Sequence, residues 1–246
     1  MSSNIPLAER MRPQTIDDIV GQEHIVGEGS VLRNALNAGR IHSIIFWGPP
    51  GVGKTTLATV ISHHLNLPFY QLSAISSGVK EIREVIDVAK KQQGAILFID
   101  EIHRFNKSQQ DALLGAVEKG IITLIGATTE NPSFEVNSAL LSRSQVYVLK
   151  PLDAMQLVQL LHTAMQKDEV LKALSIELAE TEALIRLSGG DARRLLNLFE
   201  ISIQALQAAG AKSLRVTDDI VMKAAQSKVA LYDKKGEQHY DIISAF

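Results

Sequence analysis

Between residues 40 and 150, short apolar runs alternate with stretches in which apolar residues recur at helical spacing. The runs have few polar interruptions, as is typical of strands that are covered on both faces of a sheet. They are Ser43–Trp47, Phe69–Leu72, Ala95–Ile99, Ile121–Gly126 and Val146–Leu149, and the helical stretches are 54–65, 79–92, 107–119 and 137–142. This alternation predicts an α/β fold with a parallel five-stranded sheet and helices on both faces.

The pattern changes at Pro151, a residue that neither continues a strand ladder nor enters a helix interior. Beyond it, helical spacing continues without strand-like runs, at about 153–167, 178–187, 191–208 and 217–227. Asp191 and Thr217 stand where two of these helices would begin, and their side chains are good N-caps. We therefore predict that a small all-α domain follows the sheet.

The amino-acid composition excludes several kinds of site but does not by itself indicate a function. The 246 residues carry 25 Lys and Arg against 27 Asp and Glu, so any contact with nucleic acid must come from local basic groups. There is no cysteine, which excludes disulfides, thiolate zinc sites and cysteine nucleophiles. The polar N-terminus has no signal-peptide core, and no apolar run approaches the ~20 residues of a membrane span. We expect a soluble cytoplasmic protein with no membrane partner.

The segment GPPGVGKTT at 48–56 fits the phosphate-loop pattern G-x-x-x-x-G-K-[ST] between an apolar strand and an amphipathic helix. Glycines let backbone N–H groups converge on phosphate oxygens, and the helix N-terminus adds its dipole. We expect Lys54 to face the terminal phosphates of ATP and the Thr55 hydroxyl to bind Mg²⁺. The predicted cradle consists of Gly48, Pro49, Pro50, Gly51, Val52, Gly53, Lys54, Thr55 and Thr56.

Two carboxylates end the apolar segment AILFIDE at 95–101. Asp100 is predicted to hold Mg²⁺ through its water shell, and Glu101 to act as the general base that orients the attacking water. The segment IGATTEN at 125–131 ends the next strand, where a threonine hydroxyl either contacts the γ-phosphate or water, or only caps a turn. His103 is assigned no role.

Arginines stand near two predicted element boundaries. Arg143 lies just before the last strand, and Arg193 and Arg194 lie at a helix start. Because a cation at a helix N-terminus opposes the helix dipole, the pair indicates an anionic partner. The alternative for each arginine is a solvated surface group.

In this order, the motifs resemble those of the AAA+ ATPases, and the resemblance covers essentially the whole chain. In the family pattern, Thr129 is the sensor on the strand end, Arg143 is the finger that reaches the γ-phosphate of a neighbouring subunit, and Arg193 acts in cis on the bound nucleotide. The segment 10–22 resembles the stretch that cups adenine. The residues nearest the base would be Ile19, Val20 and Gly21.

Three features of other AAA+ branches are missing from this sequence, and their absence restricts the branch that it resembles. The segment Ala74–Lys80 has no aromatic residue, unlike the pore loop of protein unfoldases. Only Gly120 separates the helix predicted at 107–119 from the next strand, which leaves no room for the hairpin of RuvB-like branch-migration motors. The four-cysteine zinc module of bacterial clamp-loader motor subunits is also absent.

The remaining similarity is to the clamp-loader-related branch, in particular to the replication-associated recombination protein A family with its Werner-helicase-interacting relatives. It rests on four runs: SGVKEIRE at 77–84, DEIHRFNKSQQDALL at 100–114, GATTENPSFEVNSALLSR at 126–143 and GDARRLLN at 190–197. Family members are DNA-dependent ATPases that act at stalled forks and single-strand gaps and associate with single-strand-binding protein. The resemblance therefore implies these partners, a homo-oligomer, and a place in the bacterial cytoplasm at the nucleoid.

The resemblance also implies a domain plan. It gives an N-terminal adenine-cupping segment at 1–20, the α/β nucleotide-binding domain at 21–151, a helical lid at 152–228 and the start of a further helical domain at 229–246. His239–Phe246 reads as a helix that begins, so we expect the chain to be part of a longer one.

Candidate DNA contacts are Lys80, Arg83 and Lys107, near the starts of two predicted helices. The alternative is that they are ordinary surface charges.

For the whole chain, the main hypothesis is a DNA-dependent ATPase. The alternatives are a nucleotide-gated scaffold or clamp-loader-like subunit with little hydrolysis and, less favoured by the missing aromatic, a protein remodeller.

Overall fold

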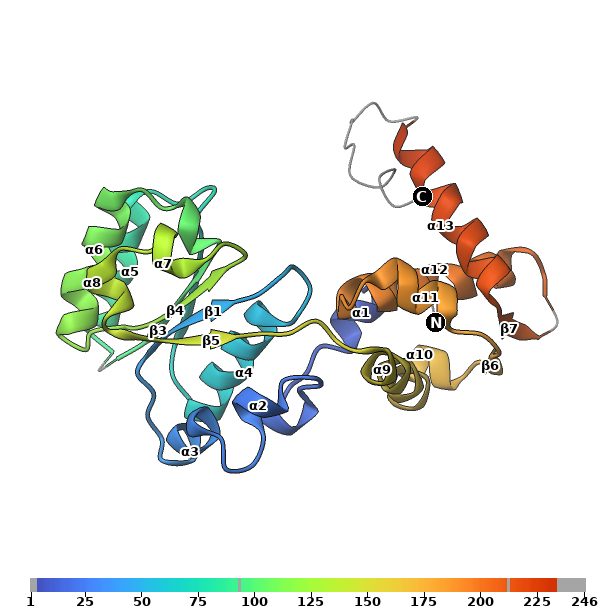
Figure 1. The fold of residues 1–246 in the computed structure, drawn as a ribbon, viewed down its shortest axis with the longest axis horizontal. Coiled ribbons are helices and arrows are strands. Elements are labelled where there is room, and N and C mark those ends of the chain that lie inside the picture. The colour runs from blue at the N-terminus through green and yellow to red at the C-terminus, as the bar shows by residue number, and fades with distance from the viewer. Residues whose placement is uncertain (1–3, 93, 212, 234–246) are drawn as a thin grey trace. The chain divides into compact units, whose positions relative to one another are not determined.

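The computed structural model describes residues 4–92, 94–211 and 213–233. Its contacts divide the chain into two compact units (Figure 1). The α/β unit is Arg12–Asp153, and the helical unit joins the residues up to Met11 with those from Ala154 onward. The helix start predicted at His239 lies outside the described residues.

The α/β unit is built on a five-stranded sheet in the order β2-β3-β4-β1-β5, in which every neighbouring pair is parallel. The strands are β1 (Ser43–Trp47), β2 (Phe69–Ser73), β3 (Ile96–Asp100), β4 (Thr123–Thr128) and β5 (Ser144–Val148). The predicted parallel five-stranded fold is confirmed. Because parallel strands end at the same edge, the residues after β3, β4 and β1 come together there.

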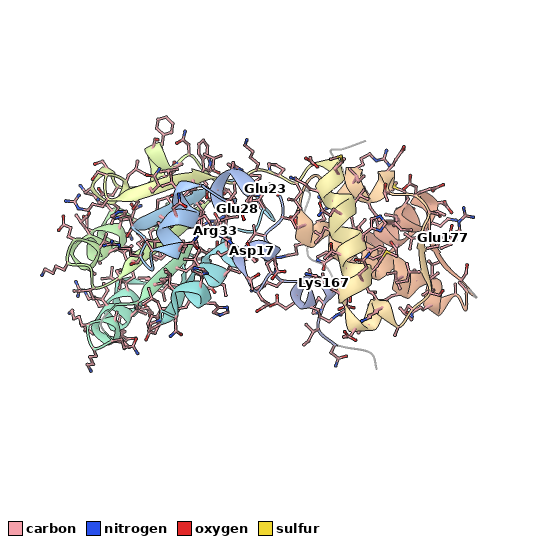
Figure 2. The ribbon with its side chains drawn as sticks, turned by 90° about the horizontal axis from the view of Figure 1, so that it is seen from below. Asp17, Glu23, Glu28, Arg33, Lys167 and Glu177 are labelled. Atoms are coloured by element: carbon pink, nitrogen blue, oxygen red, sulfur yellow. The ribbon has the colours of Figure 1, made fainter. Side chains whose placement is uncertain are left out.

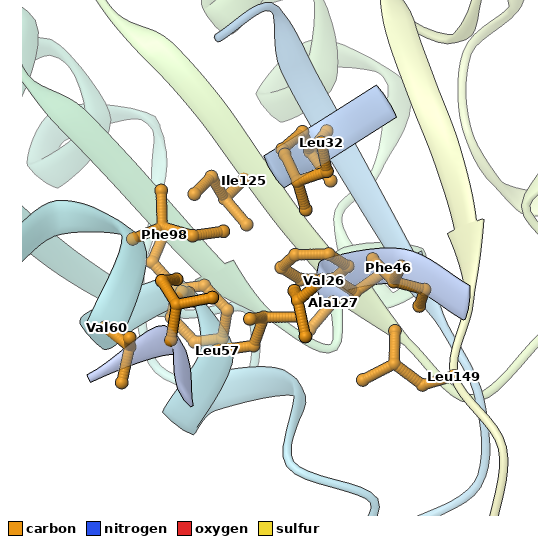
Figure 3. Packing of buried hydrophobic residues seen from close by; sticks show 14 of the residues in the cluster. Val26, Leu32, Phe46, Leu57, Val60, Phe98, Ile125, Ala127 and Leu149 are labelled. Atoms are coloured by element: carbon orange, nitrogen blue, oxygen red, sulfur yellow. The ribbon is translucent and has the colours of Figure 1, made fainter. Parts of the chain in front are cut away.

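Helices cover both faces of this sheet. They are α2 (Glu23–Val26), α3 (Val31–Asn37), α4 (Lys54–Leu65), α5 (Val79–Ala89), α6 (Lys107–Glu118), α7 (Pro132–Glu135) and α8 (Ser138–Leu141), with the 3₁₀ turns η1 (Ile16–Asp18) and η2 (Ile102–Arg104). On one face, Phe46 and Phe98 pack with Leu57 of α4 (Figure 3). On the other, Ile99 packs with Ile82 of α5 and Leu113 of α6. The two clusters follow from strand side chains that alternate between faces.

Two polar contacts order the segment that precedes β1, one within the segment and one to the chain beyond β5. The Arg33 guanidinium of α3 pairs with Asp17 of η1 at 2.7 Å, and both are labelled in Figure 2. The buried Gln22 amide donates to the Lys150 carbonyl at 2.8 Å and accepts from the Lys150 N–H at 3.1 Å. The reciprocal pair ties this segment to the chain just beyond β5.

The helical unit contains α1 (Leu7–Arg10), α9 (Ala154–Lys167), α10 (Glu169–Lys172), α11 (Glu182–Ser188), α12 (Ala192–Ala208) and α13 (Asp218–Asp233). The predicted helical character is confirmed, and Asp191 caps α12 by accepting from the Arg194 N–H at 2.9 Å. Two short parallel strands, β6 (Ile176–Leu178) and β7 (Leu214–Val216), were not predicted. Three residues are too few to show a period of two, and β6 delays the start of α11 to Glu182.

A partly buried ion pair binds the N-terminal residues to the helical unit. Arg10 meets Asp168 through two N–H···O contacts, at 2.6 and 3.1 Å, and meets Glu200 at 3.0 Å. The other Glu200 oxygen accepts from the Leu7 N–H at 3.0 Å. Burial alone would raise the pKa of Asp168, but hydrogen bonds from Arg10 and from the Leu171 N–H lower it below the ordinary value. The Asp168 carboxylate is therefore charged, and both of its oxygens accept hydrogen bonds.

Within the described part of the chain, no helix is long and apolar enough to cross a bilayer.

We predict that Arg10→Met lowers the free energy of unfolding of the helical unit by about 3 kcal/mol, because Asp168 is left buried and unpaired. Hydrogen exchange of the α12 amides measures this change. The matched control is Lys223→Met, which breaks a pair to Asp219 with both side chains 69% exposed and is expected to cost less than about 0.5 kcal/mol. Equal losses of protection in the two variants would contradict the prediction.

Candidate nucleotide site

The predicted phosphate loop joins β1 to α4 and is folded around its own lysine. Gly51 and Gly53 have φ of 74° and 96°, a conformation that glycine adopts without steric cost. Lys54 is 8% exposed, and its ammonium donates to the carbonyls of Gly48 and Pro49 at 2.6 and 2.9 Å. The charge is thus held within the loop itself.

Gly48 fixes the loop between two strand ends. Its N–H donates to the Thr128 carbonyl at the end of β4, at 3.1 Å. A Cβ at this position would lie 2.6 Å from the Leu149 carbonyl oxygen, just beyond β5. A side chain here would therefore push the loop off the sheet edge.

These features fit a phosphate ligand. The glycines keep the loop backbone uncovered, and the first N–H groups of a helix such as α4 have no partner inside the helix. Among the described residues, no cluster of three His, Asp or Glu is arranged to hold a metal ion. Thr55 and Asp100 offer a hydroxyl and a carboxylate, which are oxygen ligands of the kind that Mg²⁺ prefers, and their contact with Mg²⁺ stays a prediction.

The carboxylate predicted as the general base lies directly after β3. Glu101 has φ 54° and ψ 48°, the left-handed conformation that non-glycine residues rarely adopt. The Thr129 hydroxyl donates to Glu101 Oε2 at 3.3 Å. The structure therefore brings together the base and the sensor that the sequence proposed, from the ends of the neighbouring strands β3 and β4.

His103 and Thr128, to which the sequence analysis gave no role, belong to the same cluster. His103 Nδ1 lies 3.0 Å from Thr128 Oγ1 and 3.2 Å from Glu101 Oε2. The left-handed Glu101 and the turn η2 reverse the chain, so the ring folds back over the strand end. The only sequence signal was a histidine two residues after the acidic pair.

The predicted finger, Arg143, follows α8 and is exposed on the α/β unit. Its guanidinium pairs with Glu118 at the end of α6 at 2.6 Å and donates to the Ala139 carbonyl at 2.8 Å. Arg193, the predicted second sensor, is exposed in the first turn of α12 in the helical unit. The roles of both arginines toward nucleotide stay predictions.

The residues predicted near adenine lie just after η1, which packs on α4. Ile19 is partly buried against the core, Val20 is also partly buried, and Gly21 is buried with φ 79°. The α4 contact places this segment beside the helix that follows the phosphate loop. Contact with a base stays a prediction.

The predicted DNA contacts lie on α5 and α6. The two helix starts are joined by a hydrogen bond from the Gln109 amide to the Ser77 carbonyl, at 2.8 Å. Lys80 is exposed, 3.9 Å from Glu84, and Lys107 is the first residue of α6. Arg83 lines a groove between the helices together with Lys90 and Lys119. A contact of these residues with DNA stays a prediction.

Comparison with known families matches two segments. Residues 44–152 match the ATPase family associated with various cellular activities (AAA). Residues 170–246 match the AAA C-terminal domain. The two matches fall mainly in the α/β unit and the helical unit, respectively.

Two relatives can be aligned with nearly all of this sequence. Replication-associated recombination protein A of Escherichia coli (strain K12) is 47% identical over 98% of this chain and 55% of its own length. ATPase WRNIP1 of Dictyostelium discoideum is 40% identical over 98% of this chain and 30% of its own. The chain thus spans about half the length of the first of these relatives and about a third of the second.

Among solved structures, the Thermotoga maritima RuvB Holliday junction branch migration motor matches 88% of this chain and 72% of its own, with 28% identity and a TM-score of 0.72. In the present chain α6 ends at Glu118 and β4 begins at Thr123, with no strand between them in these described residues. The fold is therefore shared, without a hairpin at this point.

We predict that Gly48→Ala weakens binding of a non-hydrolysable ATP analogue at least about tenfold, since the added Cβ meets the Leu149 carbonyl. Isothermal titration calorimetry measures the affinity. The control is Gly115→Ala in α6, where a Cβ meets no atom within 4 Å and a helix gains stability. Unchanged affinity in Gly48→Ala would refute the steric account.

Proposed function

Because the chain belongs to the replication-associated recombination protein A family of AAA ATPases, we propose that it binds ATP with Mg²⁺ and hydrolyses it in the service of DNA replication and recombination. The observation that carries the proposal is the contact of Thr129 with Glu101, at the sheet edge where Gly48 anchors the phosphate loop. A general base and a polar sensor are thereby held beside a phosphate-binding loop.

In this proposal, the loop from Gly48 to Thr56 binds the nucleotide phosphates through its N–H groups and the α4 dipole. Lys54 exchanges its bonds to the loop carbonyls for bonds to the terminal phosphates. Mg²⁺, when bound, neutralises charge on the phosphates, and Thr55 and Asp100 would hold it. Ile19, Val20 and Gly21 contact the adenine.

Glu101 accepts a proton from the attacking water and orients it in line with the leaving group, while Thr129 senses the γ-phosphate. Preorganised cations supply the largest remaining stabilisation of the transition state. We assign this role to Lys54, to Arg193 of the same chain and to Arg143 of a neighbouring copy. The full-length protein would then be a homo-oligomer, with Arg143 released from Glu118.

The alternative is a nucleotide-gated scaffold with little turnover, and one comparison separates it from an enzyme. We predict that Glu101→Gln in the full-length protein lowers kcat by about 10²-fold or more and leaves ATP binding intact, since the amide does not accept the proton. Steady-state phosphate release in the presence of gapped DNA measures this. Equal turnover in wild type and Glu101→Gln would favour the scaffold.

We predict that the site is shared between copies. Arg143→Ala is expected to lose about 10³-fold in kcat, and Lys54→Ala to lose nucleotide binding. Mixing the two full-length variants should restore part of the activity, because a Lys54→Ala copy still donates Arg143 to a neighbour. No recovery from mixed assemblies, checked by light scattering, would argue against a finger supplied by a neighbour.

We further propose that the full-length protein acts at forks or single-strand gaps, with DNA and single-strand-binding protein as partners. The proposal is supported by the relatives' names and by the cations on α5 and α6, namely Lys80, Arg83 and Lys107. The chain has a formal charge of −2, so only such local groups are available to face phosphates.

We predict that Lys80→Ala with Arg83→Ala reduces the slope of log affinity against log salt by about 1 to 2, because up to two phosphate contacts are lost. Fluorescence anisotropy with gapped DNA over a salt series gives the slope. The charge-matched control is Lys223→Ala with Arg215→Ala, two exposed cations of the helical unit, and should leave it unchanged. The same slope in both double variants would remove α5 from the DNA surface.

A further inference from the structure

We propose that His103 is a positioning residue, which holds the Glu101 carboxylate through a hydrogen bond from Nδ1–H and is itself anchored by Thr128. The inference deepens the proposed function and rests on it. It starts from the cluster in which His103 Nδ1 lies 3.2 Å from Glu101 Oε2 and 3.0 Å from Thr128 Oγ1.

The hydrogen-bond partners of His103 Nδ1 indicate which ring nitrogen carries the hydrogen. The Thr128 hydroxyl accepts from the Glu130 N–H at 3.0 Å, and the Glu130 carbonyl lies 3.1 Å away as an acceptor for its single hydrogen. An ionised carboxylate is only an acceptor. Both neighbours of His103 Nδ1 are therefore acceptors, and a lone pair on that nitrogen would repel them. We therefore assign a hydrogen to Nδ1, which then donates to Glu101 Oε2.

Both donors reach the same carboxylate oxygen. His103 and the Thr129 hydroxyl each approach Glu101 Oε2, at 3.2 and 3.3 Å. Within the part of the chain that the structure describes, no hydrogen-bond partner takes the other oxygen, Oε1. The carboxylate is thus fixed through one oxygen, and Oε1 is the oxygen available to a water molecule.

The anchor of this arrangement, Thr128, is buried and is hydrogen-bonded to the phosphate loop. The Thr128 side chain is fully buried, and the Thr128 carbonyl accepts from the Gly48 N–H. The side chains of His103 and Glu101 are 13% and 27% exposed, so both are partly shielded from water. Thr128 therefore couples the position of the loop to the position of the general base, with His103 as the link.

The test uses three variants of the full-length protein, assayed for ATP hydrolysis. The Asn amide nitrogen lies near the place of Nδ1, whereas the Gln amide nitrogen lies nearer that of Nε2. We expect His103→Gln and His103→Ala to lose at least about tenfold in kcat, or ~1.4 kcal/mol, and His103→Asn to stay within about threefold of wild type. KM for ATP and analogue affinity should change less than about twofold in all three.

A purely structural role would change these quantities differently. Thermal unfolding identifies a variant that fails to fold, and His162→Gln, at an exposed histidine of α9, is the matched control. In a Glu101→Gln background, His103→Gln should cause no further loss. Equal kcat for Asn and Gln, or a loss confined to KM, would overturn the proposal.

A second readout does not depend on turnover. Nitrogen-15 NMR of the imidazole should show His103 protonated at Nδ1 in the wild-type protein, and Thr128→Val should weaken this preference. A neutral ring protonated at Nε2 would refute the inference even if ATP is hydrolysed. If the full-length wild type hydrolyses no ATP while His103 carries hydrogen on Nδ1, the proposed function fails and the geometry stands.

Discussion

The chemistry of the α/β unit depends on the parallel pairing of β4 with β3 on one side and β1 on the other. Parallel strands end at one edge, so the segments that follow three neighbouring strands meet there: the phosphate loop after β1, the acidic turn after β3 and the two threonines at the end of β4. The first of these bonds directly to the third, through Gly48 and Thr128. A shift of register by one residue would turn Thr128 to the other face and separate them.

Much of the fold could be predicted because its signals are local and repeated. The strand Ser43–Trp47 and the helix Lys54–Leu65 have the bounds that their apolar patterns predict. The strands β6 and β7 could not be found in this way, since each has three residues and gains stability only from pairing with a partner 38 residues away, as Ile176 does with Leu214.

The candidate site likewise contains some residues that the sequence predicts and others that only the structure brings together. The sequence motif identifies Lys54, Thr55, Asp100 and Glu101, because phosphate and metal chemistry restrict the residue types at fixed spacing. The contact between His103 and Thr128 has no such pattern. It arises from the left-handed backbone of Glu101 and from the adjacency of β3 and β4, and neither feature is visible in a single segment. The pairing of Arg143 with Glu118 is equally non-local.

The ion pairs of Arg10 have a consequence for the order in which the protein is made. Arg10 leaves the ribosome long before Glu200, which follows it by 190 residues. During synthesis, every residue of the α/β unit emerges between these two partners, so that unit can complete its sheet first. The helical unit can join its N-terminal helix α1 to α12 only when α12 has been translated. A nascent chain that stops before Glu200 therefore lacks the acceptor of the Leu7 N–H and one of the two carboxylates that pair with Arg10.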